Sequence, residues 1–133
     1  MNNKMDIVRG KTWARQFYFT QTLADGSAAT VGAPGWGAEF ALFDTQNPNL
    51  VLAVASVANN KAAWTADGIL WVSFSQSETL TFDFDRAAWC VDLIVPNTSL
   101  DPLGYREGVL SGELRVQARA GGQPNRAFTQ TRL

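Results

Sequence analysis

Hydrophobic residues in this chain alternate with polar residues over short stretches and show no long helical repeat. The clearest stretch is 105–119, where one set of alternating positions is apolar or small and the other set is polar. The first set consists of Leu110, Gly112, Leu114, Val116 and Ala118, and the second of Ser111, Glu113, Arg115, Gln117 and Arg119. A period of two places successive side chains on opposite faces of a strand. This stretch is therefore predicted to be a strand with one buried face.

Similar stretches recur along the chain and are separated by turn-forming residues. Besides 105–119, the predicted strands are 5–8, 13–21, 36–43, 50–57, 69–75 and 89–95. The stretch 50–57 is apolar on both faces, which fits either a strand covered on both sides or a short buried helix. Ser75 and Glu78 have capping-box spacing, which predicts a single helical turn. The whole pattern indicates an all-β fold, an antiparallel β-sandwich or barrel of about seven to eight strands with at most one short helical turn.

The length and composition fit one folded domain with a tail. The 133 residues are 46% hydrophobic, and five Trp and eight Phe supply bulky side chains for a single core. Residues 1–120 are predicted to form one sandwich domain, because no repeat or linker divides them. Residues 121–133 are rich in Gly, Gln and Thr and are predicted to form an extended C-terminal tail.

Acidic and basic residues almost cancel, with twelve of the first kind and eleven of the second. Such a chain has no net field to attract nucleic acid or an anionic membrane, so neither is expected as a partner. The longest near-apolar stretch, 50–58, is about half the length that a membrane helix needs. Residues 1–10 are too polar for a signal peptide. We therefore expect a soluble protein that is made in the cytoplasm without an export signal.

Histidine is absent and Cys90 is the only cysteine. This composition removes the commonest general base, the commonest zinc ligand and any internal disulfide. The best carboxylate group is Asp83 and Asp85, with Asp92 nearby. A glycosidase holds two carboxylates about 5 to 9.5 Å apart across a cleft. Two phenylalanines alternate with Asp83 and Asp85, however, and this pattern is typical of a half-buried strand whose acids are solvated.

Signatures of metal sites and activated nucleophiles are weak or missing. An all-oxygen metal site needs more than Asp-x-Asp, and the twelve-residue calcium-loop pattern does not occur. Ser73, Ser75 and Ser77 have no histidine to activate them, and the glycines at 32, 35 and 37 do not form a phosphate loop. We predict that the protein is not an enzyme and uses no metal or other cofactor.

Trp64 and Trp71 are the best candidates for exposed aromatic residues. Trp71 is out of phase with the apolar positions on either side of it, so it is predicted to face outward. An exposed pair of this kind is suited to stacking against sugar rings. Contacts with protein partners explain such residues just as readily.

The order of several segments resembles that of small β-sandwich proteins in phage tails and baseplates. The opening 6–13 (DIVRGKTW) resembles their short first strand and Arg-Gly turn. The later segments 75–80 (SQSETL), 89–93 (WCVDL) and 109–116 (VLSGELRV) follow in the same order as in that group. The resemblance covers about residues 5–118 and implies an immunoglobulin-like sandwich, similar to the N-terminal domain of siphophage upper baseplate proteins.

This resemblance implies a phage virion structural protein, an adaptor in the tail, baseplate or neck that acts by subunit assembly. The implied partners are other virion proteins and further copies of the chain, and the implied location is the virion. The alternative is a carbohydrate- or host-receptor-binding module on the virion surface. Exposed or two-faced apolar positions are the predicted interface, namely Leu50, Val51, Leu52, Val54, Trp64, Ile69, Trp71 and Phe128.

Overall fold

The computed structural model describes residues 4–96 and 105–117, which form ten strands and one short helix. The elements are β1 (Lys4–Val8), β2 (Trp13–Tyr18), β3 (Thr20–Thr22), β4 (Ala28–Thr30), β5 (Gly37–Phe43), β6 (Val51–Ser56), β7 (Ala62–Ala66), β8 (Ile69–Phe74), α1 (Gln76–Leu80), β9 (Arg86–Val95) and β10 (Tyr105–Gln117). Phe128 and the predicted tail 121–133 lie outside the described residues, as do residues 97–104 and the last two residues of the predicted strand 105–119.

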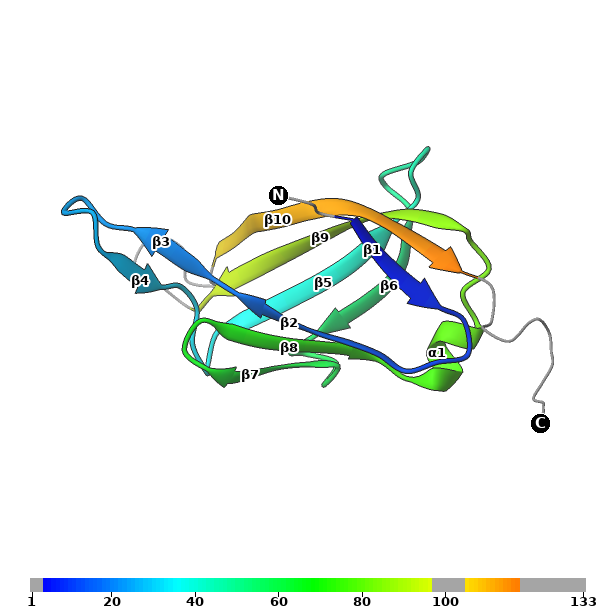
Figure 1. The fold of residues 1–133 in the computed structure, drawn as a ribbon, viewed down its shortest axis with the longest axis horizontal. Coiled ribbons are helices and arrows are strands. Elements are labelled where there is room, and N and C mark those ends of the chain that lie inside the picture. The colour runs from blue at the N-terminus through cyan, green and yellow to red at the C-terminus, as the bar shows by residue number, and fades with distance from the viewer. Residues whose placement is uncertain (1–3, 97–104, 118–133) are drawn as a thin grey trace.

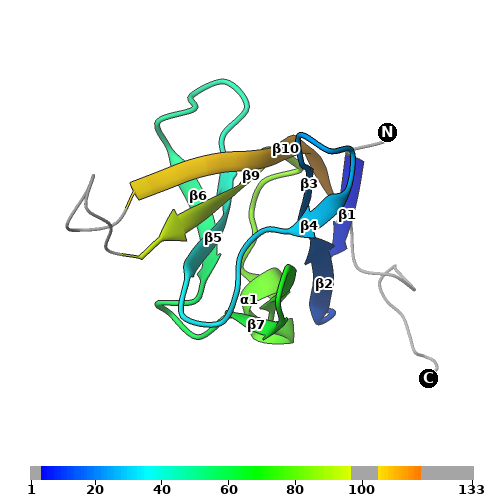
Figure 2. The same cartoon turned by 90° about the vertical axis from the view of Figure 1, so that its left-hand side faces the viewer.

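Two sheets form a β-sandwich, with the short helix at one end (Figure 1). The five-stranded sheet has the order β1-β10-β9-β5-β6, and the three-stranded sheet has the order β2-β8-β7. All neighbouring strands are antiparallel except β1 and β10, which run parallel. A separate hairpin, β3–β4, continues from β2 and projects from the end opposite α1 (Figures 1 and 2).

The core lies between the two sheets and is rich in aromatic rings. Phe40 on β5 is fully buried and contacts Trp13, Phe17, Phe74 and Trp89 from both sheets, with ring centroids 5.2 to 6.1 Å apart. Aromatic pairs at these separations add roughly 0.5 to 1.5 kcal/mol each beyond the burial of their area. The aromatic residues that the sequence supplies are therefore the main material that joins the sheets.

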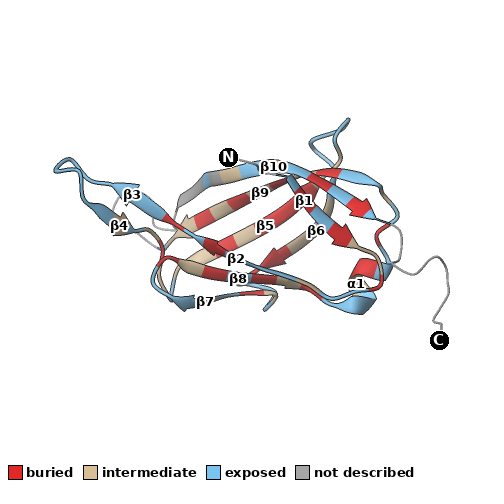
Figure 3. Cartoon of the chain, in the orientation of Figure 1, coloured by how far each residue is buried: buried red, intermediate tan, exposed pale blue. Residues whose placement is uncertain are grey.

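Strand alternation confirms most of the predicted faces, as the buried and exposed bands of Figure 3 show. On β8, Leu70, Val72 and Phe74 are buried while Trp71 is exposed. On β10, Leu114 is buried as predicted and the polar positions around it are exposed. The capping box is also present, because Glu78 N–H donates to Ser75 Oγ and Ser75 N–H donates to Glu78 Oε1. Local alternation and cap chemistry thus determine these elements.

Two strand predictions were wrong. The predicted strand 13–21 divides at Phe19, which donates its N–H to Gly68 and accepts a hydrogen bond from Val31 N–H. The chain thereby changes partner from β8 to β4, and the predicted strands omitted both β4 and β7. Residues 82–85 were expected to alternate within a strand, but they form an irregular connection between α1 and β9. Their alternating burial comes from Phe82 and Phe84 packing toward the end of the core.

Candidate interaction surfaces

Within β2, β7 and β8, the outward positions of the three-stranded sheet carry no charged residue; Lys61, whose carbonyl accepts from Ser73 N–H, borders them with its ammonium bonded to Glu78. The register of the sheet places Gln16 and Ala63 on either side of Trp71, and Tyr18 and Ala66 on either side of Ile69. We call this surface the neutral face, and its members are Ala14, Gln16, Tyr18, Ala63, Ala66, Ile69, Trp71 and Ser73.

Two aromatic side chains stand open on the neutral face. Tyr18 is 66% exposed and Trp71 is 40% exposed. They are diagonal neighbours across β2 and β8, a relation that separates two residues by roughly 7 to 8 Å. The Tyr18 hydroxyl donates to Gln16 Oε1 at 2.8 Å, so the tyrosine is held along its own strand. The result is an apolar patch with a hydroxyl and an amide on a flat sheet.

The outward side of the five-stranded sheet is charged toward its β1 edge, whereas its central positions Ala41, Val54 and Cys90 are not. Asp6, Arg115 and Arg86 lie in register on β1, β10 and β9, and Lys4 lies opposite Glu113. Together with Thr45, these side chains line a groove of about 570 Å³. The Arg115 guanidinium lies 3.3 Å from an Asp6 carboxylate oxygen, and both side chains are more than half exposed. Such pairs add little stability, so this side is a solvated surface of the usual kind.

Trp64 does not join Trp71 on a common platform, which corrects the expectation from the sequence. Trp64 pairs with Leu70 on β8 and therefore faces the core, whereas Trp71 pairs with Ala63 and faces outward. The Trp64 ring packs edge-on against Phe19, and its Nε1 donates to the carbonyl of Trp36. The separation follows from the register of β7 and β8, because Leu70 and Trp71 are adjacent on β8 and point to opposite faces, and each cross-strand partner shares the face of the residue it pairs with.

Gly32 makes room for Trp64. Its backbone has φ +88°, and a Cβ atom at this position would lie 2.2 Å from Trp64 Cη2. Gly32 also accepts a hydrogen bond from Gly68 N–H, which connects the approach to β5 with the β7–β8 turn. Gly32 therefore serves core packing around an indole ring.

The predicted interface positions on and before β6 differ in how far they are exposed to solvent. Leu50 and Val51 are about half exposed, while Leu52 and Val54 are half-buried and Leu52 packs against the core. Leu50 lies in the turn before the strand, where its N–H donates to Asn47. Only the beginning of β6 thus presents apolar side chains to solvent, and 50–57 is a strand over residues 51–56 and not a helix.

Asn59 covers part of the free edge of β6. Because Val57 donates its N–H to Ala38 on the β5 side, the backbone groups of Val54 and Ser56 point away from β5. Asn59 Oδ1 accepts from Ser56 N–H at 2.8 Å, and Asn59 Nδ2 donates to the Val54 carbonyl at 3.1 Å. The side-chain amide thus occupies the hydrogen-bonding positions that an added strand would need.

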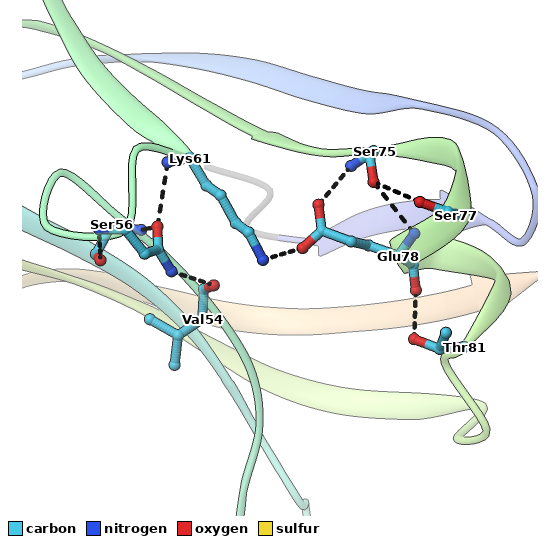
Figure 4. A network of polar contacts seen from close by, with 8 residues as sticks. Val54, Ser56, Lys61, Ser75, Ser77, Glu78 and Thr81 are labelled. Carbon is cyan, nitrogen blue, oxygen red and sulfur yellow. Dashed lines mark hydrogen bonds and ion pairs between the residues drawn. The ribbon is translucent and has the colours of Figure 1, made fainter.

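A polar network links this edge to the helix (Figure 4). Lys61 N–H donates to Asn59 Oδ1 and to the Ser56 carbonyl, and the Lys61 ammonium is bonded to Glu78. Burial works to raise the pKa of Glu78, but the hydrogen bonds from Lys61 and Ser75 outweigh it and hold that pKa below the ordinary value. The network therefore stabilises the β6–β7 turn and α1 as one unit.

The carboxylates singled out in the sequence do not converge. Asp83 and Asp85 are exposed in the connection before β9, and Asp85 is paired with Arg9 at 3.0 Å. Asp92 lies seven residues further along the extended chain, which corresponds to roughly 20 Å from Asp85, and it pairs in register with Glu39. In the part of the chain that the structure describes, no group of three or more Asp, Glu or Cys side chains is placed to hold a metal ion.

Comparison with known proteins adds no relative. No protein-family model matches the chain, and no curated protein matches it either. Within residues 4–96 and 105–117, no helix is long and apolar enough to cross a membrane. The functional interpretation therefore rests on the fold and on the contrast between the neutral face and the charged side.

Proposed function

We propose that this chain is a structural protein of a phage virion, an adaptor in the tail, baseplate or neck that works by binding neighbouring subunits. The observation that carries the proposal is the neutral face. A solvated antiparallel sheet normally alternates apolar-in with polar-out. A charge-free outer face that exposes Tyr18 and Trp71 departs from that pattern and resembles the core of a protein interface, where charged residues are depleted and aromatic residues enriched.

The strand order supports the immunoglobulin-like part of the proposal. In the variable type of that fold, strands G, F, C and C′ share one sheet, and strands B, E and D share the other. The orders β10-β9-β5-β6 and β2-β8-β7 correspond to these two sets in chain sequence. A small rigid sandwich of this kind is suited to presenting faces, edges and loops to neighbours in a ring.

The proposed partners are other virion proteins and further copies of the chain, with neither nucleic acid nor a membrane as a ligand. The proposed location is the virion. Binding to other virion proteins and to further copies of the chain would both rely on many weak contacts repeated by symmetry, because a small domain offers limited area at each face.

Mass spectrometry of purified particles tests this function. We expect peptides of the chain in particles of the phage that encodes it, at a fixed ratio to a tail or capsid protein of known copy number. A particle reconstruction should then show another chain on the neutral face. A chain that is abundant in the infected-cell lysate but absent from purified particles would contradict the proposal.

Carbohydrate binding is the second candidate, and a specific observation favours it. Tyr18, Gln16 and Trp71 combine aromatic rings with an amide on an open surface, which suits a neutral sugar. This arrangement replaces the Trp64–Trp71 pair on which the idea first rested. Calorimetric titration of host-surface glycans decides it, because binding must disappear in Trp71→Ala and persist in Leu80→Ala, which changes an exposed residue on α1.

A further inference from the structure

The neutral face continues beyond the sandwich onto the projecting hairpin. Strand alternation carries the outward side from Tyr18 past buried Phe19 to Thr20 and Thr22. On β4, Thr30 pairs with Thr20 and Ala28 pairs with Thr22. The extension is again without charge, and its side chains are small and exposed.

The hairpin has a well-defined turn but little support from the rest of the molecule. Leu23 and Ser27 close the loop, Gly26 donates its N–H to Leu23, and Asp25 accepts from the Ser27 N–H and hydroxyl. Every residue from Thr20 to Thr30 is exposed except Ala29, which is half-buried (Figure 3). A two-stranded hairpin alone is only marginally stable in water, so a covered position would stabilise it.

We propose that a second copy of this chain packs on the neutral face about a two-fold axis near Thr20, so that the hairpin of each copy covers Tyr18 and Trp71 of the other. This inference rests on the proposed function in assembly and identifies the partner of that surface. It describes an isologous contact, in which the same patch serves both copies and the assembly closes as a dimer.

Charge favours a second copy as the occupant. A two-fold axis brings each residue of a patch close to the same patch on the partner, so like charges on it would repel. The strand positions of the neutral face and of its extension contain no charged side chain, with Lys61 at the border and Asp25 at the hairpin tip, whereas the opposite side of the sandwich holds Lys4, Arg86 and Arg115 together with Asp6 and Glu113. Self-association through the neutral face therefore meets little electrostatic opposition, whereas association through the charged side must remove several ionised groups from water.

The two parts of the patch, on the sandwich and on the hairpin, also complement each other in side-chain size and are similar in length. The sandwich part of the patch carries the large side chains Tyr18, Ile69 and Trp71, while the hairpin carries only threonine and alanine on the same side. From Thr20 to Ala14 and from Thr20 to the hairpin tip the chain spans a similar length, roughly 15 to 20 Å. Rotation about an axis near Thr20 thus places small residues over large ones at both ends.

The contact is expected to be weak in isolation. A patch roughly 30 Å long and 10 to 14 Å wide covers about 300 to 400 Å² per copy, roughly half of what a standard stable interface buries on each partner. We therefore expect a dimer that is populated only at high concentration, and that becomes stable where neighbouring contacts in a particle raise the local concentration.

Sedimentation of the full-length chain at about 20 to about 500 µM, supported by native mass spectrometry, tests the contact. We expect the dimer fraction to rise across this range, and Trp71→Ala to lower the association constant at least tenfold. Leu80→Ala is the matched control, because Leu80 is 53% exposed on α1 and lies off the face. Circular dichroism establishes that each variant is folded. A chain that stays monomeric at the highest concentration, or equal effects of the two variants, would overturn the proposal.

Cross-linking locates the axis. In a Cys90→Ala background, Thr20→Cys should be joined to the same residue of the partner by a short bismaleimide, because residues at a two-fold axis face their own copies. Thr45→Cys, on the charged side, should react at least tenfold less. Equal cross-linking would contradict the proposed axis. If the chain is found in particles but shows neither a dimer nor a selective cross-link, a second copy is not the partner of the neutral face. The proposed structural function in the virion would still hold.

Discussion

Arg9 ties the turn after β1 to the connection that leads into β9. Its Nε donates to the Phe82 carbonyl at 2.7 Å, and one terminal nitrogen donates to the Phe84 carbonyl at 2.8 Å and to Asp85 at 3.0 Å. The Arg9 side chain is largely buried, whereas the Asp85 side chain is 88% exposed. The two carbonyl contacts therefore hold this segment more strongly than the ion pair does.

We expect Arg9→Met to lower the free energy of unfolding by about 1.5 to 3 kcal/mol, because two carbonyls lose a charged donor. Asp85→Asn should cost less than about 1 kcal/mol, since water screens the exposed pair. Urea denaturation of both variants measures the difference. Equal losses would mean that the ion pair is the main interaction.

The side-chain amide of Asn59 is expected to stabilise the edge of β6. Asn59→Ala leaves Ser56 N–H and the Val54 carbonyl without the amide that now bonds them, so we expect a loss of about 1 to 2 kcal/mol. Asn49→Ala is the control, because Asn49 is exposed in the turn before β6. Chemical denaturation compares them. The Asn59 variant should also self-associate more readily through the uncovered edge, and identical stabilities would contradict the capping role.

Among the elements, α1 depends on its capping box and on Lys61. Glu78 has a lowered pKa, so its contribution to stability is present above the ordinary value of 4.5 and is lost as the pH falls through the lower value of the folded state. We expect Glu78→Gln to be less stable than the natural chain at neutral pH, with a gap that closes as the pH falls below the ordinary value of 4.5. Denaturation at several pH values measures this gap. A gap independent of pH would mean that the carboxylate charge is not involved.

The approach to β5 depends on a glycine that admits an indole ring. In Gly32→Ala the new methyl group meets the Trp64 ring, and the residue must also keep a positive φ, so we expect a loss of roughly 3 kcal/mol or more. Gly26→Ala is the matched control, because its φ is +87° but no atom lies within 4 Å of the added Cβ. It should cost only about 1 to 2 kcal/mol from backbone strain. Thermal unfolding separates the two, and equal shifts would show that the clash is relieved.

For the whole molecule, the two sides of the sandwich predict opposite responses to salt. If copies associate through the neutral face, the association constant should change less than about twofold between roughly 50 and 500 mM NaCl, because exposed charges are screened over this range and the face has none. A contact through the groove near Arg86 and Arg115 would respond several-fold. Sedimentation at the two salt concentrations distinguishes them.

The positions of the strands followed from the sequence wherever burial was one-sided. On β8 and β10 the alternation correctly assigned inward and outward side chains, including outward Trp71 and inward Leu114. At Phe19 the chain changes its partner strand, but the alternation of side chains in the sequence continues through this point. The sequence pattern therefore did not reveal the extra hairpin. Phase along a strand is a local property, whereas the choice of partner strand is not.

The candidate surface was predicted only in part. Ile69 and Trp71 belong to the neutral face, but Trp64 does not, and Tyr18 was not among the predicted interface residues. Leu50 and Val51 are exposed elsewhere, at the start of an edge strand. The missing information was which residues of β2 and β7 lie beside Trp71, which depends on the register of three strands.

The amino-acid sequence by itself determined an all-β chain with two-sided strands, a capped helical turn and an aromatic interior, because these features depend on neighbours a few positions away. Only the tertiary structure decided that one outer side is charged and the other is neutral, that Asn59 covers an edge and that Arg9 bridges distant segments. These features join residues far apart along the chain, and their geometry is set by how strands pair and sheets pack.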